Sequence, residues 1–143
     1  MAALTALFEQ VAAGGTEIVM VSGASGIGKS ALVGELGTAL VRRQGLLVEG
    51  KFDQFQRSTP YAAVAAALRR LVRQWLSEDA AAQAAWRERI GRALGGNGQV
   101  MVDLVPELET LLGPQPPVSE LPRTEAQNRF QIALVDFVRC IAA

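Results

Sequence analysis

Apolar residues recur along this chain with two different spacings. Over residues 3–11, and again over 29–41, they return every three or four positions, which predicts two helices. Residues 18–21 and 46–48 are instead short, continuously apolar runs, which is typical of strands buried on both faces of a parallel sheet. The order strand, glycine-rich turn, helix, strand predicts an α/β fold in which helices accompany a parallel sheet.

Beyond residue 51 the strand pattern stops and helical spacing dominates. Pro60 suits the first position of a helix, and Thr124 with Gln127 forms a capping box that opens a later one. We expect helices over 58–75, 82–94, 100–112 (bent at Pro106) and 124–141, with a connector over 113–122 that holds four prolines. The expected core positions are Val64, Leu68, Leu71, Val72 and Trp75 in the first of these helices, and Phe130, Leu134, Phe137, Val138 and Ile141 in the last.

The composition of the chain excludes several classes of function and site. The 143 residues carry 14 basic and 14 acidic side chains, so the chain lacks the basic footprint of a nucleic-acid binder. No apolar run reaches the length of a membrane span, and no basic residue precedes Lys29, so we expect a cytoplasmic protein without a signal peptide. A single cysteine and the absence of histidine exclude an intrachain disulfide, histidine zinc sites and histidine-based triads.

One motif carries most of the chemical information. Residues 23–30 fit G-x-x-x-x-G-K-[ST], and they lie between a predicted strand and a predicted helix. In that setting backbone N–H groups and the positive end of the helix converge on phosphate oxygens, Lys29 reaches the β- and γ-phosphates, and the Ser30 hydroxyl binds Mg²⁺. The sequence therefore predicts a nucleoside triphosphate site, without deciding between ATP and GTP, formed by Gly23, Ala24, Ser25, Gly26, Ile27, Gly28, Lys29, Ser30 and Ala31.

An acid that completes the metal site is harder to find. Asp103 and Asp136 each follow apolar residues as a strand-end acid would, but both lie within helical patterns, so we interpret them as helix residues. Two strands are also few for an open parallel sheet. We therefore expect the chain to be the front part of a nucleotide-binding domain, with the acid-bearing strand beyond Ala143, and we do not predict hydrolysis by this chain alone.

Three further stretches, 50–61, 96–117 and 125–130, extend the pattern beyond the loop. With the loop they resemble the AAA-type, STAND-class, origin-recognition-like ATPase domain of large bacterial proteins that join a serine/threonine kinase, this ATPase, GAF or PAS sensors and a histidine kinase. The resemblance implies a P-loop fold, ATP and Mg²⁺ as cofactors, the other domains of such a polypeptide as partners, and a nucleotide-dependent regulatory switch. It implies that 1–143 is the N-terminal part of the ATPase domain, with the strand, loop, helix and strand unit over 14–50 and a mainly helical part over 58–143.

Two other functions stay open at this point. A small-molecule P-loop kinase would use Asp53 and Arg57 to hold its acceptor, and a degenerate interaction domain would keep the loop without turnover. Other charged groups have simpler explanations. Arg69, Arg70 and Arg73 fit the polar side of an amphipathic helix, and Glu125 with Arg129 fits a helical pair.

Overall fold

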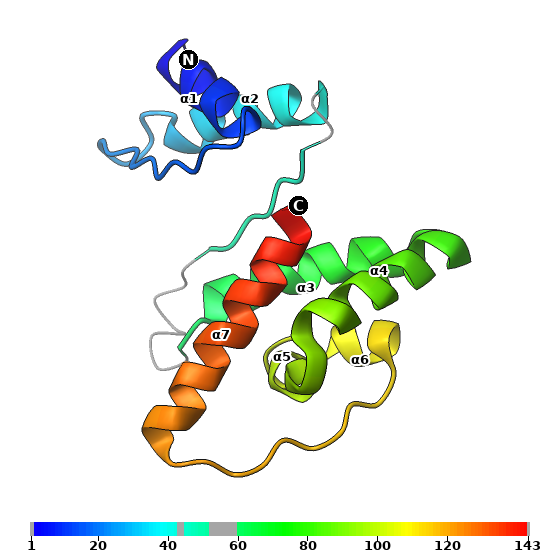
Figure 1. Ribbon diagram of the computed structural model, residues 1–143. Helices are drawn as coiled ribbons and strands as arrows, with labels where there is room; N and C mark the ends of the chain where they lie inside the picture. The colour runs from blue at the N-terminus through cyan, green and yellow to red at the C-terminus, as the bar shows by residue number, and fades with distance from the viewer. Residues whose placement is uncertain (1, 43–44, 52–59, 143) are drawn as a thin grey trace. The chain divides into compact units, whose positions relative to one another are not determined.

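The computed structural model describes residues 2–42, 45–51 and 60–142, and it divides into two compact units, Met1–Leu47 and Val48–Ala143. The first unit holds α1 (Ala2–Ala12) and α2 (Lys29–Arg42), drawn in blue and cyan in Figure 1. The second holds α3 (Ala62–Leu76), α4 (Ala80–Leu94), the short 3₁₀ helix η2 (Gly95–Asn97), α5 (Gly98–Leu104), α6 (Glu107–Leu112) and α7 (Arg123–Ala142).

In the first unit, α1 and α2 contact one another and are joined by the segment 13–28. Helix α1 ends at Ala12 and is followed by Gly14, whose φ of 101° lies in the left-handed region that favours glycine. The Gly14 N–H donates to the Val11 carbonyl at 2.9 Å, which satisfies one of the last carbonyls of the helix. Both helices of this unit match the segments that apolar spacing predicts.

The predicted parallel sheet is wrong for the described residues. Neither 18–21 nor 46–48 forms a strand, and Ile18 and Met20 are 95% and 90% exposed rather than buried. A strand exists through hydrogen bonds to a neighbouring strand, and neither run has such a neighbour in the described part of the chain. Apolar, β-branched side chains favour a strand but do not form one without that partner.

The core lies in the second unit. Trp75 of α3 and Phe137 of α7 are its largest fully buried side chains, and Trp86 of α4 packs against it. Figure 1 shows α7, in orange and red, crossing the other helices of this unit, and its contacts are mainly with α4 and α5, while α6 contacts α3 and α4. The buried cluster consists of Leu68, Leu71, Val72, Trp75, Ile90, Leu94, Met101, Val102, Val105, Leu108, Leu111, Ala133, Phe137 and Cys140.

Two predicted core positions are exposed in the structure, and a third, Phe130, is half-buried outside the core cluster. Val64 is 37% exposed and Val138 is 47% exposed, whereas Ala133 and Cys140 of α7 are buried. Ala133, Phe137 and Cys140 are spaced by four and three residues, so they form one stripe on α7, and Val138 lies to one side of it. Spacing predicts an apolar face, but the packed neighbours decide which part of that face is covered.

Pro106 divides the predicted helix over 100–112 into two. Helix α5 ends before Val105, whose φ of −131° and ψ of 82° lie outside the helical region, and α6 begins at Glu107. The proline ring disfavours helical backbone at the preceding residue, which accounts for a break rather than the expected bend. The connector over 113–122 has no regular structure, and α7 begins at Arg123, one residue before the predicted capping threonine.

Candidate phosphate-binding loop

Residues 23–28 form a loop that runs directly into α2 (Figure 1). Gly26 and Gly28 have φ of 81° and 95°, a conformation that glycine adopts at little cost and other residues rarely adopt. The Ile27 N–H donates to the Ala24 carbonyl at 3.4 Å, which closes a turn within the loop. The sequence therefore supplies glycine at the two positions where the backbone needs a left-handed conformation.

The first helical hydrogen bond of α2 runs from the Leu32 N–H to the Gly28 carbonyl, at 2.9 Å. The N–H groups of residues 28–31 precede this bond, so they have no acceptor within the helix. They mark the positive end of the helix dipole, and the 14-residue helix is long enough to carry one. Loop and helix together offer a row of backbone donors for an anion.

Lys29 is folded back onto the loop. Its Nζ atom donates to the carbonyl oxygens of Gly23 and Ala24, at 2.8 Å and 2.7 Å. A Cβ atom on Gly23 would lie 3.1 Å from Cγ2 of Ile27, so the first glycine also lets the loop close on itself. The ammonium group is thereby held beside the loop that the motif predicts to surround a phosphate chain.

The donor set suits a magnesium-bound polyphosphate. Backbone N–H groups and an ammonium bind phosphate oxygens, and the exposed Ser30 in the first turn of α2 carries a hydroxyl oxygen, the ligand type that Mg²⁺ prefers. Within the described ranges, no three acidic or cysteine side chains gather into a metal site of their own.

The remaining candidate acids lie on helices of the second unit. Asp103 is exposed on α5 and accepts a hydrogen bond from Nε2 of Gln99 at 2.8 Å, and Asp136 is half-buried on α7. Neither ends a strand, in agreement with the helical interpretation of both patterns. Asp53 and Arg57, the residues of the alternative kinase hypothesis, lie outside the described residues.

The arginines of α3 have a structural partner. Arg73 binds Oε1 of Glu107 through Nη2 at 2.7 Å and Nε at 3.1 Å, and Arg69 Nε lies 3.7 Å from Oε2 of the same carboxylate. Burial raises the pKa of Glu107, but hydrogen bonds from its own backbone and from Arg73, with the charges of both arginines, outweigh burial and lower the pKa overall. Both arginines therefore form ion pairs that link α3 to α6.

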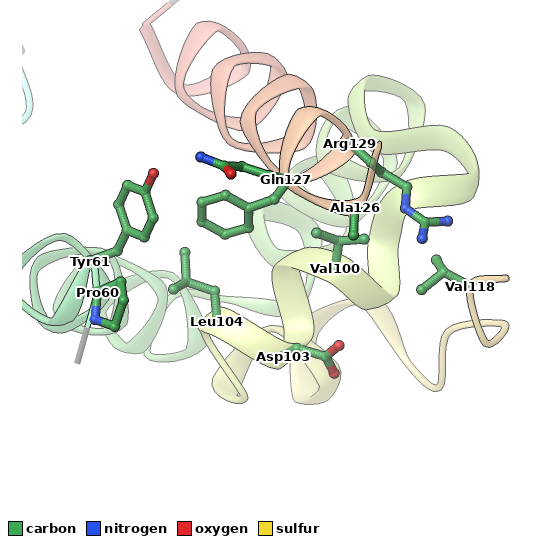
Figure 2. A pocket seen from close by; sticks show the side chains of 10 residues that line it. Pro60, Tyr61, Val100, Asp103, Leu104, Val118, Ala126, Gln127 and Arg129 are labelled. Atoms are coloured by element: carbon green, nitrogen blue, oxygen red, sulfur yellow. The ribbon is translucent and has the colours of Figure 1, made fainter. Parts of the chain in front are cut away.

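The second unit also contains a pocket of about 510 Å³ that is lined in part by Tyr61, Asp103 and Arg129 (Figure 2). The sequence patterns did not predict this pocket. Arg129 was predicted to pair with Glu125, but in the structure its Nη2 atom donates a hydrogen bond to the Ser119 carbonyl at 2.7 Å. The motif stretch 125–130 contains two of the residues that line this pocket with polar groups, Gln127 and Arg129. The occurrence of these two polar residues within one motif stretch was the sequence feature that could have pointed to the pocket.

Comparison with known proteins decides the family. The model of the AAA ATPase domain matches residues 1–143. The chain belongs to this family. The ATPase domain assignment in the sequence resemblance is therefore confirmed, while its bacterial and STAND-class details are not shown by these matches.

Two curated relatives of this AAA domain are histidine kinases. Hybrid signal transduction histidine kinase G of Dictyostelium discoideum is 38% identical over 137 residues, which cover 94% of this chain. Histidine protein kinase 1 of Candida albicans is 29% identical over 100 residues, or 69% of this chain. The chain spans about 4% of the length of either relative.

No solved structure matches the chain significantly. None of the described helices is both long enough and apolar enough to cross a membrane.

Proposed function

We propose that this AAA domain binds Mg-ATP through residues 23–31 and acts as a nucleotide-dependent switch in a multi-domain signalling kinase. The observation that carries the proposal is the fold of the loop around Lys29. Two glycines with left-handed backbone, the open N-terminal end of α2 and the ammonium group occur within one short segment. Membership in the AAA ATPase family favours ATP over GTP as the nucleotide.

The residues divide the task of binding. Backbone N–H groups of 24–31 bind phosphate oxygens, and Gly26 and Gly28 allow the left-handed backbone that the loop adopts. Lys29 leaves its carbonyl partners to neutralise the β- and γ-phosphates, and the Ser30 hydroxyl would be a ligand of the metal. Mg²⁺, when bound, would supply positive charge that neutralises the phosphate oxygens.

The switch follows from the partners of Lys29. In the structure the ammonium group is held by two neutral carbonyls of the loop. A γ-phosphate offers a charged acceptor, and hydrogen bonds to charged groups are the stronger kind. Loss of the γ-phosphate favours the return of Lys29 to Gly23 and Ala24, so the loop has two arrangements that nucleotide selects between. In a histidine kinase such as the two relatives, this change would bias the neighbouring domains.

Equilibrium binding of a fluorescent ATP analogue with Mg²⁺ tests the site. Replacing Lys29 with alanine removes a charge-assisted contact of about 1.5–3 kcal/mol, so affinity should fall by about 10- to 100-fold. Lys51→Ala is the matched control, because it removes the other lysine of the chain, which lies outside the loop. Circular dichroism should show unchanged helical content in both variants. Equal affinity of Lys29→Ala and wild type would refute the site.

Hydrogen exchange tests the switch separately. Mg-ATP and Mg-ADP should protect the amides of 24–31 to different extents, because only ATP provides the γ-phosphate that draws Lys29 away from its carbonyls. Identical protection by the two nucleotides, with binding of both demonstrated, would leave the nucleotide site standing and contradict the switch.

A further inference from the structure

The pocket in the second unit lies outside the proposed phosphate site and is built from side chains of that unit alone. Its volume of about 510 Å³ lies in the range of about 300–1,000 Å³ that is typical of small-molecule sites. The start of α3, helix α5, the connector and helix α7 all contribute to it (Figure 2). Its apolar lining includes Val100, Leu104 and Val118.

An aromatic pair forms one side of the pocket. The rings of Tyr61 and Phe130 lie with centroids 4.8 Å apart, at an angle of 47°, and Tyr61 is 41% exposed. Figure 2 shows Tyr61 near Leu104, and Phe130 also lines the cavity. Such a pair presents a surface on which a further ring can pack edge to face or offset.

The backbone of Tyr61 is held in an unfavourable conformation. Its φ is 59°. Among the residues that the structure describes, Tyr61 is the one residue other than glycine with a positive φ. Tyr61 occupies the N-cap position of α3, yet its side chain makes no capping hydrogen bond, so capping does not compensate the backbone cost. In this conformation the Tyr61 ring packs against Phe130 at the pocket. Strain of this kind is concentrated at binding sites.

Two opposite charges complete the lining. Asp103 lies on α5 and Arg129 on α7, and both line the same cavity. Gln99 holds one carboxylate oxygen of Asp103, and the Ser119 carbonyl holds one nitrogen of Arg129. A carboxylate has a second acceptor oxygen and a guanidinium has five N–H donors, so each retains capacity for a ligand while its side chain is fixed.

From this juxtaposition we infer that the pocket binds a small zwitterion with an aromatic body, of the chemical class of the aromatic amino acids. The ring of the ligand lies against Tyr61 and Phe130, its ammonium group pairs with Asp103, and its carboxylate pairs with Arg129. The apolar side chains of α5 cover the ring, and the two charged groups of the ligand, which share its α-carbon, face Asp103 and Arg129. A few convergent polar groups in an apolar cavity are what orients a small molecule.

Tyr61 is the single tyrosine of the chain, so it provides its own probe. Full-length protein labelled with 3-fluorotyrosine gives one fluorine resonance at the pocket. Titration with L-tryptophan to millimolar concentrations should shift this resonance in a saturable way. Tryptamine, which lacks the carboxylate, and N-acetyl-L-tryptophan, which lacks the ammonium group, should each bind at least about tenfold more weakly, since each loses one charge-assisted contact.

Variants assign the contacts. Asp103→Asn keeps an oxygen for Gln99 but removes the charge, and Arg129→Gln removes the guanidinium, so each should weaken L-tryptophan binding by about tenfold or more. Arg139→Gln is the control, because Arg139 is an exposed arginine of the same helix that does not line the pocket. Unchanged far-ultraviolet circular dichroism verifies folding. Absence of a saturable shift with L-tryptophan, or equal binding by both pocket variants and the control, overturns the inference.

Discussion

The indole rings of Trp75 and Trp86 stack with centroids 4.2 Å apart and planes 22° from parallel. Trp75 belongs to α3 and Trp86 to α4, so the stack joins two helices that the turn at residues 77–79 connects. The Phe137 ring of α7 meets Trp75 edge-on, with centroids 6.4 Å apart. Three helices therefore share one aromatic contact at the centre of the second unit.

This contact predicts the most damaging core substitution. Trp75 is 1% exposed, so Trp75→Ala should lower the free energy of unfolding by about 3–5 kcal/mol through lost burial and a cavity. Urea unfolding followed by circular dichroism measures the change. Ile132→Ala on α7 serves as the control, because Ile132 is 57% exposed and its loss should change stability by less than about 0.5 kcal/mol. Similar losses for both variants would contradict the assigned core.

Two glycines of the first unit predict opposite effects from the same substitution. Gly28→Ala places a side chain on a residue with φ of 95°, so it should strain the loop by about 1 kcal/mol or more and weaken Mg-ATP binding. Gly34→Ala lies inside α2 with no atom within 4 Å of the new Cβ, so it should stabilise the helix by about 0.5–1 kcal/mol. Thermal unfolding and nucleotide titration of both variants check the signs. A loss of affinity in Gly34→Ala equal to that in Gly28→Ala would argue against the loop geometry.

The ion pair between α3 and α6 predicts a dependence of stability on pH. The folded state lowers the pKa of Glu107 below its ordinary value of 4.5. Stabilisation is therefore complete above that value and is lost as pH falls through the lower, folded pKa. Because Arg73 is largely exposed, we expect Glu107→Gln to cost about 1 kcal/mol at most at neutral pH. Urea unfolding of both proteins from neutral to strongly acidic pH should show this difference shrinking, and a difference that grows in acid would contradict the pairing.

The N-cap of α4 predicts a smaller effect. The Asp79 carboxylate accepts from the Ala82 N–H at 2.9 Å, which satisfies one of the first N–H groups of the helix. Asp79→Ala should cost about 1 kcal/mol in the free energy of unfolding, whereas Asp79→Asn keeps the acceptor and should cost much less. Denaturant titration of the two variants compares them directly. Equal losses would show that the side-chain oxygen is not what stabilises this helix.

Local features that depend on near neighbours in sequence were predictable. Apolar spacing predicted α1, α2 and the stripe of α3 that contains Leu68, Leu71 and Trp75, because helix hydrogen bonds join residues four apart and need no distant partner. The motif predicted a glycine-rich turn before the helix, and Gly26 and Gly28 have positive φ there. The roles of Lys29 and Ser30 at a nucleotide remain predictions.

Features that depend on distant residues were not predictable. The runs 18–21 and 46–48 have the composition of strands, but a strand requires a partner from elsewhere in the chain, and the described residues provide none. The pairing of Glu107 with Arg73 joins residues 34 positions apart, and the pocket joins Tyr61 to Phe130. The sequence by itself thus determined which segments can be helical and where the loop bends. Only the tertiary structure decided which faces are covered and which charged groups meet, because those contacts bring together residues that no local period relates.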